Sequence, residues 1–209
     1  KIENLSNSQD TQLLQKALNE DSETVDIHHA GTAMRFLTSF YAIQEGRKTI
    51  LTGSERMKQR PIKPLVDALR ELGAEINYLE NEGFPPLEIH GKRIERNFVK
   101  IPANISSQFI TSLLLIGASL ENGLEIELKG EITSRSYIKM TLKILKDIGI
   151  ESRFERNSIK ILSSETSLYN KQLEKHFHTS KIKHYTVESD WSSASYFYSL
   201  VAIGKKKMH

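Results

Sequence analysis

The hydrophobic positions of this chain follow two periods, and the changes from one to the other predict strands and helices in a regular order. Short runs in which apolar and polar residues alternate, or in which β-branched residues dominate, predict strands. Longer stretches with apolar side chains three and four positions apart predict amphipathic helices. Both kinds of segment occur along most of the chain, so we expect an α/β fold.

Three segments share one design, in which a strand leads through a short loop into an apolar helix that begins with small polar residues. They read TVDIHHAGTAMRFLTSFYAI, FVKIPANISSQFITSLLLIG and HYTVESDWSSASYFYSLVAIG. The helices begin near Gly31, Ser106 and Ser192, so the unit recurs after roughly 75 to 86 residues, which is longer than a solenoid repeat.

Each complete unit continues with a second strand, a second helix and two short strands. These are predicted at 48–52, 62–72, 76–78 and 87–89 in the first unit, and at 124–128, 138–148, 152–154 and 159–162 in the second, with a turn at Asn157-Ser158. Gly73 and Gly149 follow the second helices at matching positions, where glycine commonly ends a helix. The predicted unit is therefore βαβαββ.

The repeat is expected to begin and end partway through a unit. Asp10-Thr11 opens an apolar helix that corresponds to the second helix of an earlier unit, whose first helix is missing. The helix predicted at 195–204 corresponds to a first helix without its following strand, and residues 163–183 have no clear period and predict an inserted or crossing loop.

The length of 209 residues is long for one average domain and short for two. We expect residues 1–188 to form one near-complete domain, and residues 189–209 to form a crossover and the first helix of a truncated second domain. The amino end has neither an initiating Met nor the apolar core of a signal peptide, which favours an internal position in a longer protein.

Composition narrows the chemistry available to the chain. It has no Cys, which excludes disulfides, thiolate nucleophiles and Cys-ligated metals. Its mainly apolar run at 113–120 is far shorter than the roughly 20 residues that cross a bilayer. The net charge of +3 suits anionic ligands only weakly. Walker, GxGxxG, GxSxG and HExxH motifs are absent, which argues against ordinary nucleotide, serine-hydrolase and zinc-protease sites.

The starts of the predicted helices are candidate anion sites, because they expose N–H groups and the positive end of the helix dipole. Small residues there let an anion approach the backbone. Such residues recur at equivalent positions, namely Gly31-Thr32, Ser106-Ser107 and Ser192-Ser193. Each pair alone is better explained as an ordinary helix cap, whereas the recurrence at equivalent positions favours anion binding.

Arginine residues follow several predicted strands or lie in the first turn of a helix. They are Arg35, Arg56, Arg60 and Arg135. A guanidinium group suits phosphate and carboxylate, although each of these side chains is also compatible with a surface salt bridge.

Other polar clusters give weaker signals. The pairs His28-His29 and His176/His178 lack further ligands for a metal site. Residues 205–207, all Lys, resemble a nucleic-acid patch but lack an aromatic platform or an extended basic stripe. We predict neither a metal nor a nucleic-acid or membrane partner. Asp190 is interpreted as a hinge or cap rather than a catalytic group.

Six ordered motifs give the chain a family resemblance. They read AGTAMRF, LTGSERMKQRPI, LVDALRELGA, ISSQF, SRSYI and SDWSSASYF, and the chain that carries them resembles the 5-enolpyruvylshikimate-3-phosphate synthase family. The resemblance implies a monomeric, cytoplasmic, two-domain transferase with three βαβαββ units per domain, an inside-out α/β barrel. It implies no cofactor, and shikimate 3-phosphate and phosphoenolpyruvate as substrates bound between the domains.

Matching the motifs residue by residue implies a set of substrate contacts. Shikimate 3-phosphate would be bound by Ser106, Ser107, Gln108, Ser134 and Tyr137, and phosphoenolpyruvate by Gly31, Arg60 and Gln108, with Thr32, Arg35 and Arg56 as weaker candidates. The resemblance implies no catalytic residue in this chain, since the family's acid–base groups come from regions outside it. His29 stands where the family usually has Asn, and Phe36 where it usually has Pro.

The resemblance implies transfer of the enolpyruvyl group from phosphoenolpyruvate to the 5-hydroxyl of shikimate 3-phosphate, with this fragment alone inactive. Three alternatives stay open: a standalone anion-binding module without catalysis, a relative of UDP-N-acetylglucosamine enolpyruvyl transferase, and a nucleic-acid-binding module suggested by the pI of about 8.9. The second alternative is disfavoured because that enzyme's usual loop Cys has no counterpart here.

Overall fold

The computed structural model describes residues 2–163, 185–187 and 191–204. The chain divides into two compact regions, residues 1–177 and 178–209, which are described separately. The predictions made for His176, His178, Asp190, residues 205–207 and most of the loop at 163–183 lie outside the described residues. In the region 178–209, the helix predicted at 195–204 is present as α7 (Trp191–Gly204).

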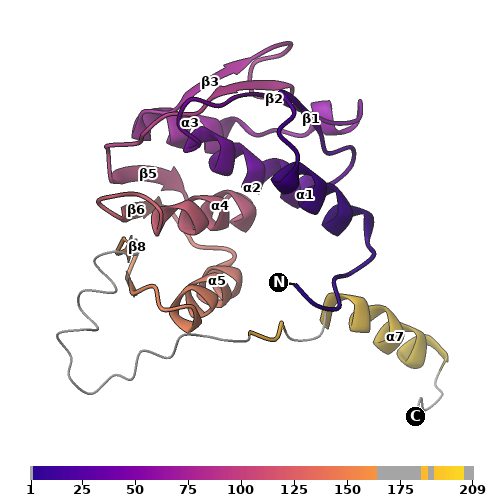
Figure 1. The fold of residues 1–209 in the computed structure, drawn as a ribbon. Coiled ribbons are helices and arrows are strands. Elements are labelled where there is room, and N and C mark those ends of the chain that lie inside the picture. The colour runs from indigo at the N-terminus through magenta and orange to yellow at the C-terminus, as the bar shows by residue number, and fades with distance from the viewer. Residues whose placement is uncertain (1, 164–184, 188–190, 205–209) are drawn as a thin grey trace. The chain divides into compact units, whose positions relative to one another are not determined.

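The first βαβαββ unit forms as predicted (Figure 1). Its elements are β1 (Thr24–Asp26), α2 (Gly31–Ala42), β2 (Lys48–Thr52), the short 3-10 helix η1 (Met57–Gln59), α3 (Lys63–Leu72), β3 (Glu75–Tyr78) and β4 (Leu87–His90). The strand order is β1-β2-β4-β3, with β1 parallel to β2 and the other pairs antiparallel. Gly73 ends α3 with φ of 110°, a conformation that favours glycine.

The second unit repeats this topology. Its elements are β5 (Phe98–Pro102), α4 (Ser107–Gly117), β6 (Leu124–Lys129), α5 (Arg135–Asp147), β7 (Ser152–Glu155) and β8 (Ser158–Ile161). The strand order is β5-β6-β8-β7, and again only the first pair is parallel. Two four-stranded sheets with the same order and directions confirm the predicted fold class and repeat.

Three local predictions need adjustment. The turn between β7 and β8 consists of Arg156 and Asn157 rather than Asn157 and Ser158, and Arg156 takes the positive φ of 52°. Ile148 was expected on the buried face of α5, but it follows the helix and is exposed. The first helix, α1 (Gln9–Asn19), begins one residue earlier than expected, because Ser8 caps it by accepting from the Thr11 N–H.

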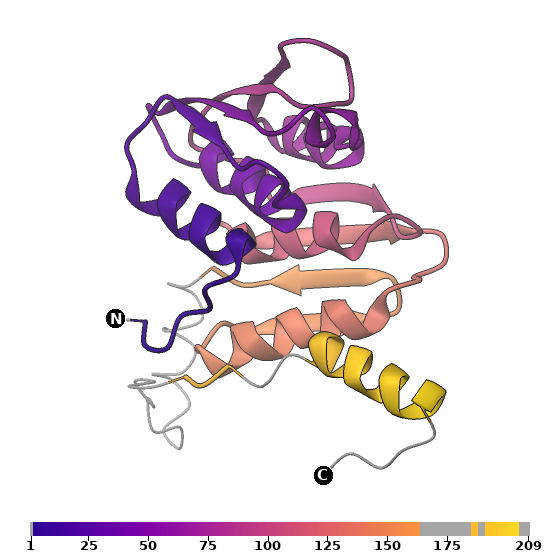
Figure 2. The same cartoon turned by 90° about the vertical axis from the view of Figure 1, so that its right-hand side faces the viewer.

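The first helix of each βαβαββ unit, α2 or α4, is mostly buried. The second helix of each unit, α3 or α5, is buried along one side only. Nine of the 12 residues of α2 and seven of the 11 residues of α4 are buried. By contrast, α3 and α5 bury only one apolar stripe. Figures 1 and 2 show α2, α4 and α5 side by side. Burial of α2 and α4 explains why their sequences are apolar almost all round.

Buried polar groups fix how the two interior helices pack. The hydroxyl groups of Ser39 and Ser112 lie 2.6 Å apart, and Ser112 Oγ also donates to the Arg35 carbonyl at 2.6 Å. Tyr41 donates to the Ala17 carbonyl at 2.8 Å and so ties α1 to α2. These contacts are satisfied pairs, which is how polar groups are normally accommodated in a core.

Candidate functional site

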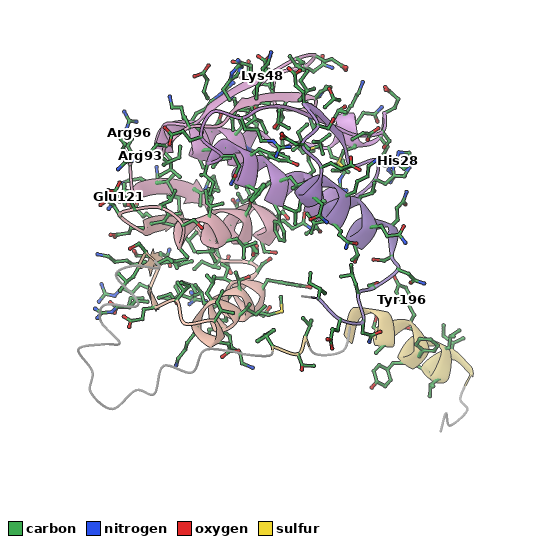
Figure 3. All side chains as sticks on the ribbon, viewed as in Figure 1. His28, Lys48, Arg93, Arg96, Glu121 and Tyr196 are labelled. Carbon is green, nitrogen blue, oxygen red and sulfur yellow. The ribbon has the colours of Figure 1, made fainter. Side chains whose placement is uncertain are left out.

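The loops that carry the candidate residues leave each sheet at the same edge. Asp26 pairs with Thr52 at the carboxyl ends of the parallel strands β1 and β2, and Pro102 pairs with Lys129 at the ends of β5 and β6. Because parallel strands end at one edge of a sheet, the loop before α2 begins beside the loop that contains Arg60. In Figure 3, His28 lies at this edge, far from Arg93, Arg96 and Glu121.

Gly31 and Arg60 are in direct contact at the start of α2. A Cβ atom added to Gly31 would lie 2.7 Å from Cζ of Arg60 and closer still to its Nη1. The guanidinium group therefore occupies the space that any other residue at position 31 would fill. Gly31 is buried and Arg60 is exposed, so a cation stands beside the free N–H groups at the start of α2.

Arg35 lies one turn further along α2 and is only 4% exposed. Its guanidinium donates to the carbonyls of Gly31 at 2.9 Å and Pro61 at 3.4 Å. Burial, together with the nearby charge of Arg60, lowers the pKa of Arg35 to about 10. Arg35 therefore joins the start of α2 to the segment that carries Arg60 and holds the Gly31–Arg60 pair together.

The starts of the two interior helices are joined by a hydrogen bond between units. Gln108 Nε2 donates to Thr32 Oγ1 at 2.9 Å, across 76 positions of sequence. Ser106 caps α4 by accepting from the Gln108 N–H at 3.4 Å, and Ser107 is the first residue of that helix. The candidate positions at the starts of α2 and α4 thus form one continuous group.

Ser134 and Tyr137 lie at the start of α5, after β6. Tyr137 is 55% exposed, and Ser134 is half-buried. Within the described part of the chain, neither side chain makes a hydrogen bond to the group around Gly31. Their helix, α5, contacts α4 instead, where the hydroxyl group of Thr141 on α5 lies 3.3 Å from that of Thr111 on α4.

A hollow of about 580 Å³ lies beside this group, lined by His29, Arg56, Met57 and Arg60. None of the ion pairs between described residues includes Arg56 or Arg60. Two guanidinium groups without a carboxylate partner favour occupation of the hollow by an anion.

Sequence reasoning missed the environment of His29. Its Nδ1 lies 2.7 Å from Ser54 Oγ, so the loop before α2 is bonded to the loop after β2. His28 has a positive φ of 49°, and its carbonyl accepts from the Ser54 N–H at 3.0 Å. The sequence signals nothing of this contact, since the two residues lie 25 positions apart in irregular segments.

No three His, Cys, Asp or Glu side chains within the described ranges are arranged to hold a metal ion. None of the described helices has both the length and the apolar character needed to cross a membrane.

Residues 2–209 match the model of the family described as EPSP synthase (3-phosphoshikimate 1-carboxyvinyltransferase). The chain is 48% identical over 202 residues to the 3-phosphoshikimate 1-carboxyvinyltransferase of Bacteroides fragilis strain YCH46, which covers 97% of this chain and 46% of that protein. It is 44% identical over 195 residues to the enzyme of the same name from Haemophilus influenzae strain KW20, 42% of which is covered. The chain spans about half the length of these curated relatives.

A comparison of folds agrees with these sequence matches. The EPSP synthase structure from Acinetobacter baumannii superimposes on the chain with a TM-score of 0.58 at 23% identity, covering 68% of this chain and 31% of the other. This likeness concerns the fold alone. Together with the family match over residues 2–209, the repeated units and the joined helix starts identify the chain as a member of the EPSP synthase family.

Proposed function

We propose that this chain is part of an enzyme that transfers the enolpyruvyl group of phosphoenolpyruvate to the 5-hydroxyl of shikimate 3-phosphate and releases phosphate. In that reaction the vinyl methylene carbon is protonated and the hydroxyl oxygen attacks the neighbouring carbon. Phosphate then leaves from the tetrahedral adduct as a proton is lost from the new methyl group. Family membership supports the reaction, and it is also the ground for proposing a monomeric enzyme of the cytoplasm.

The proposed share of this chain is substrate binding. We assign residues 1–188 to the domain that binds shikimate 3-phosphate, and residues 189–209 to the crossover and the beginning of the other domain. The acid–base groups are assigned to the rest of the enzyme. Catalysis then depends on this chain for positioning and for positive charge near the phosphate and carboxylate groups.

One observation carries the proposal most directly, namely the bond from Gln108 to Thr32 that joins the two helix starts. Anions that bind at both starts would lie next to each other, as the two substrates of a transfer reaction must. We assign phosphoenolpyruvate to Gly31, Arg60 and Gln108, with Thr32 beside them.

Shikimate 3-phosphate is assigned to the start of α4 and the loop before α5, namely to Ser106, Ser107, Gln108, Ser134 and Tyr137. The exposed Ser106 hydroxyl and the positive end of the α4 dipole suit a phosphate group. The exposed ring of Tyr137 is positioned to line the carbocyclic ring of the substrate.

Steady-state kinetics of the full-length enzyme test this assignment. Replacing Arg60 by Ala should raise the KM for phosphoenolpyruvate by about tenfold or more, because a charge-assisted contact is lost. The KM for shikimate 3-phosphate should change much less. The double replacement Ser106→Ala and Ser107→Ala should have the reverse effect.

Arg96→Ala serves as a matched control, because Arg96 is an exposed arginine whose side chain donates to the Glu71 carbonyl on a different edge. Equal changes in both KM values for the Arg60 and serine variants would contradict the assignment. Absence of enolpyruvyl transfer by the unaltered full-length enzyme would contradict the function itself.

A further inference from the structure

We propose that His29 is a further ligand of the anion in the hollow that Arg56 and Arg60 also line, and that Ser54 positions the His29 ring. The inference deepens the proposed function, on which it rests, by adding a residue pair to the phosphoenolpyruvate site. The two residues come from different loops, which meet where β1 and β2 end.

The first step concerns the orientation of the imidazole ring. Ser54 Oγ accepts a hydrogen bond from the Met57 N–H at 3.3 Å and lies 2.7 Å from His29 Nδ1. We infer that the Ser54 hydroxyl donates to Nδ1 while its oxygen accepts from the Met57 N–H. Donation to Nδ1 places the proton of the neutral ring on Nε2.

The other nitrogen of the His29 ring, Nε2, is available to a ligand. His29 lines the hollow together with Arg56, Met57 and Arg60. Within the described residues, His29 Nε2 has no hydrogen-bond partner, although Nδ1 does. A ring held at Nδ1 therefore offers an N–H donor at Nε2, and a protonated ring offers the same donor with a positive charge.

The third step concerns the charge of the ligand. Arg56 and Arg60 are exposed and unpaired with any described carboxylate, and Arg60 also lies close enough to lower the pKa of Arg35. A second donor type beside two guanidinium groups suits an oxyanion with several acceptor oxygens, which both ends of phosphoenolpyruvate supply. His29 then adds one hydrogen bond to a site that already has charge.

His28, whose ring contacts that of His29, is a suitable position for a control substitution. Their ring centroids lie 4.1 Å apart, both residues are exposed, and His28 does not line the hollow. His28 has a positive φ, which Asn tolerates better than most residues. His28→Asn therefore removes an adjacent imidazole without straining the loop.

The test compares variants of the full-length enzyme at positions 29, 54 and 28 by steady-state kinetics. His29→Phe keeps a planar ring without nitrogen and should raise the KM for phosphoenolpyruvate by about three- to tenfold, the worth of one hydrogen bond. His29→Gln can place an amide N–H near the position of Nε2 and should recover most of that loss. The kcat value and the KM for shikimate 3-phosphate should change by less than about twofold in both.

Ser54→Ala should raise the KM for phosphoenolpyruvate in the same direction, and Ser54→Thr, which keeps the hydroxyl group, should not. Adding Ser54→Ala to His29→Phe should cause no further loss, because Ser54 acts through His29. His28→Asn should leave both KM values unchanged. Thermal unfolding of each variant separates loss of binding from loss of folding.

The outcomes distinguish this inference from the proposed function. If Arg60→Ala raises the KM for phosphoenolpyruvate and His29→Phe does not, the role of His29 is wrong while the site stands. If neither variant changes that KM, the assignment of phosphoenolpyruvate to this hollow is wrong. If His29→Phe and His29→Gln lose equally, the effect does not come from Nε2, and the inference is overturned.

Discussion

At the scale of single residues, Gly31 and Arg60 constrain each other. The guanidinium group lies where a side chain at position 31 would begin, so the identity of residue 31 sets the position of the cation. The backbone of Gly31 does not require glycine, because its φ is not in the positive range. The reason for glycine at this position is therefore space for Arg60 rather than backbone conformation.

Replacing Gly31 by Ala should push the Arg60 guanidinium away from the start of α2. We expect the KM for phosphoenolpyruvate to rise by about tenfold, which corresponds to ~1.4 kcal/mol. Stability should change little, because the atoms that the new Cβ would meet belong to the end of the flexible Arg60 side chain. Kinetics of the full-length enzyme and thermal unfolding measure the two effects. An unchanged KM for phosphoenolpyruvate would show that Arg60 does not act from this position.

At the scale of elements, polar contacts decide how helices and strands pair. Ser112 joins α4 to α2 through Ser39 and the Arg35 carbonyl, among the buried apolar residues of the core. On the first sheet, Glu88 of β4 accepts from Lys48 of β2 at 2.9 Å and from Asn77 of β3 at 3.4 Å, and lies 3.2 Å from His90 Nε2. Figure 3 shows Lys48 on the outer side of this sheet.

Replacing Ser112 by Ala should lower the free energy of unfolding by about 1–3 kcal/mol, since Ser39 and the Arg35 carbonyl lose a buried partner. Chemical denaturation of the chain measures this loss. The double replacement of Ser39 and Ser112 by Ala should cost less than the sum of the single changes, because the two hydroxyl groups interact. Strict additivity would indicate that they do not.

The Glu88 network predicts how the stability of the first sheet depends on pH. Hydrogen bonds from Lys48, His90 and Asn77 lower the pKa of Glu88 to about 2, and the bond from Lys48 has the largest effect. A lowered carboxyl pKa stabilises the fold above the normal value of about 4.3, and this contribution is lost as pH falls towards 2.

Glu88→Gln should therefore flatten the decline in the unfolding midpoint between about pH 4.5 and 2. Glu155→Gln removes an exposed carboxylate from β7, in the other sheet, and serves as the control. Thermal unfolding across the pH range measures both. The same acid decline in Glu88→Gln as in the unaltered chain would contradict the prediction.

At the scale of the whole molecule, the chain joins two copies of one topology through their first helices. Each copy brings a helix start to a sheet edge, and the Thr32–Gln108 bond places the two starts together. The chain covers 46% of the Bacteroides fragilis relative, and over that share it is 48% identical. Under the proposed function, this chain supplies substrate-binding groups and the rest of the enzyme supplies the acid–base groups.

The isolated 209-residue chain should bind shikimate 3-phosphate weakly and should catalyse no transfer, because the proposed acid–base groups lie in the rest of the enzyme. Titration calorimetry with shikimate 3-phosphate measures binding, and phosphate release in the presence of both substrates measures turnover. Loss of the binding heat in the Ser106→Ala and Ser107→Ala double variant would place it at α4. Turnover by the purified chain would refute the division of labour.

Much of the fold follows from local pattern. Apolar periodicity, Gly73 and Gly149 located the helices, and alternation located the strands, because both depend on residues that are close in sequence. Local pattern was least accurate at the β7–β8 turn and at Ile148, where one residue shifts the outcome. Family motifs added the candidate ligands, although their assignment to substrates is still a prediction.

Contacts between distant residues had to come from the three-dimensional structure. Three contacts of the site join positions 25 or more residues apart. They are those of Arg60 with Gly31, Gln108 with Thr32 and His29 with Ser54. Period and composition carry no information about such pairs, since they depend on strand order, on the shared edge of parallel strands and on the close packing of α2 against α4. Local periodicity thus specifies the elements, and their packing assembles the site from them.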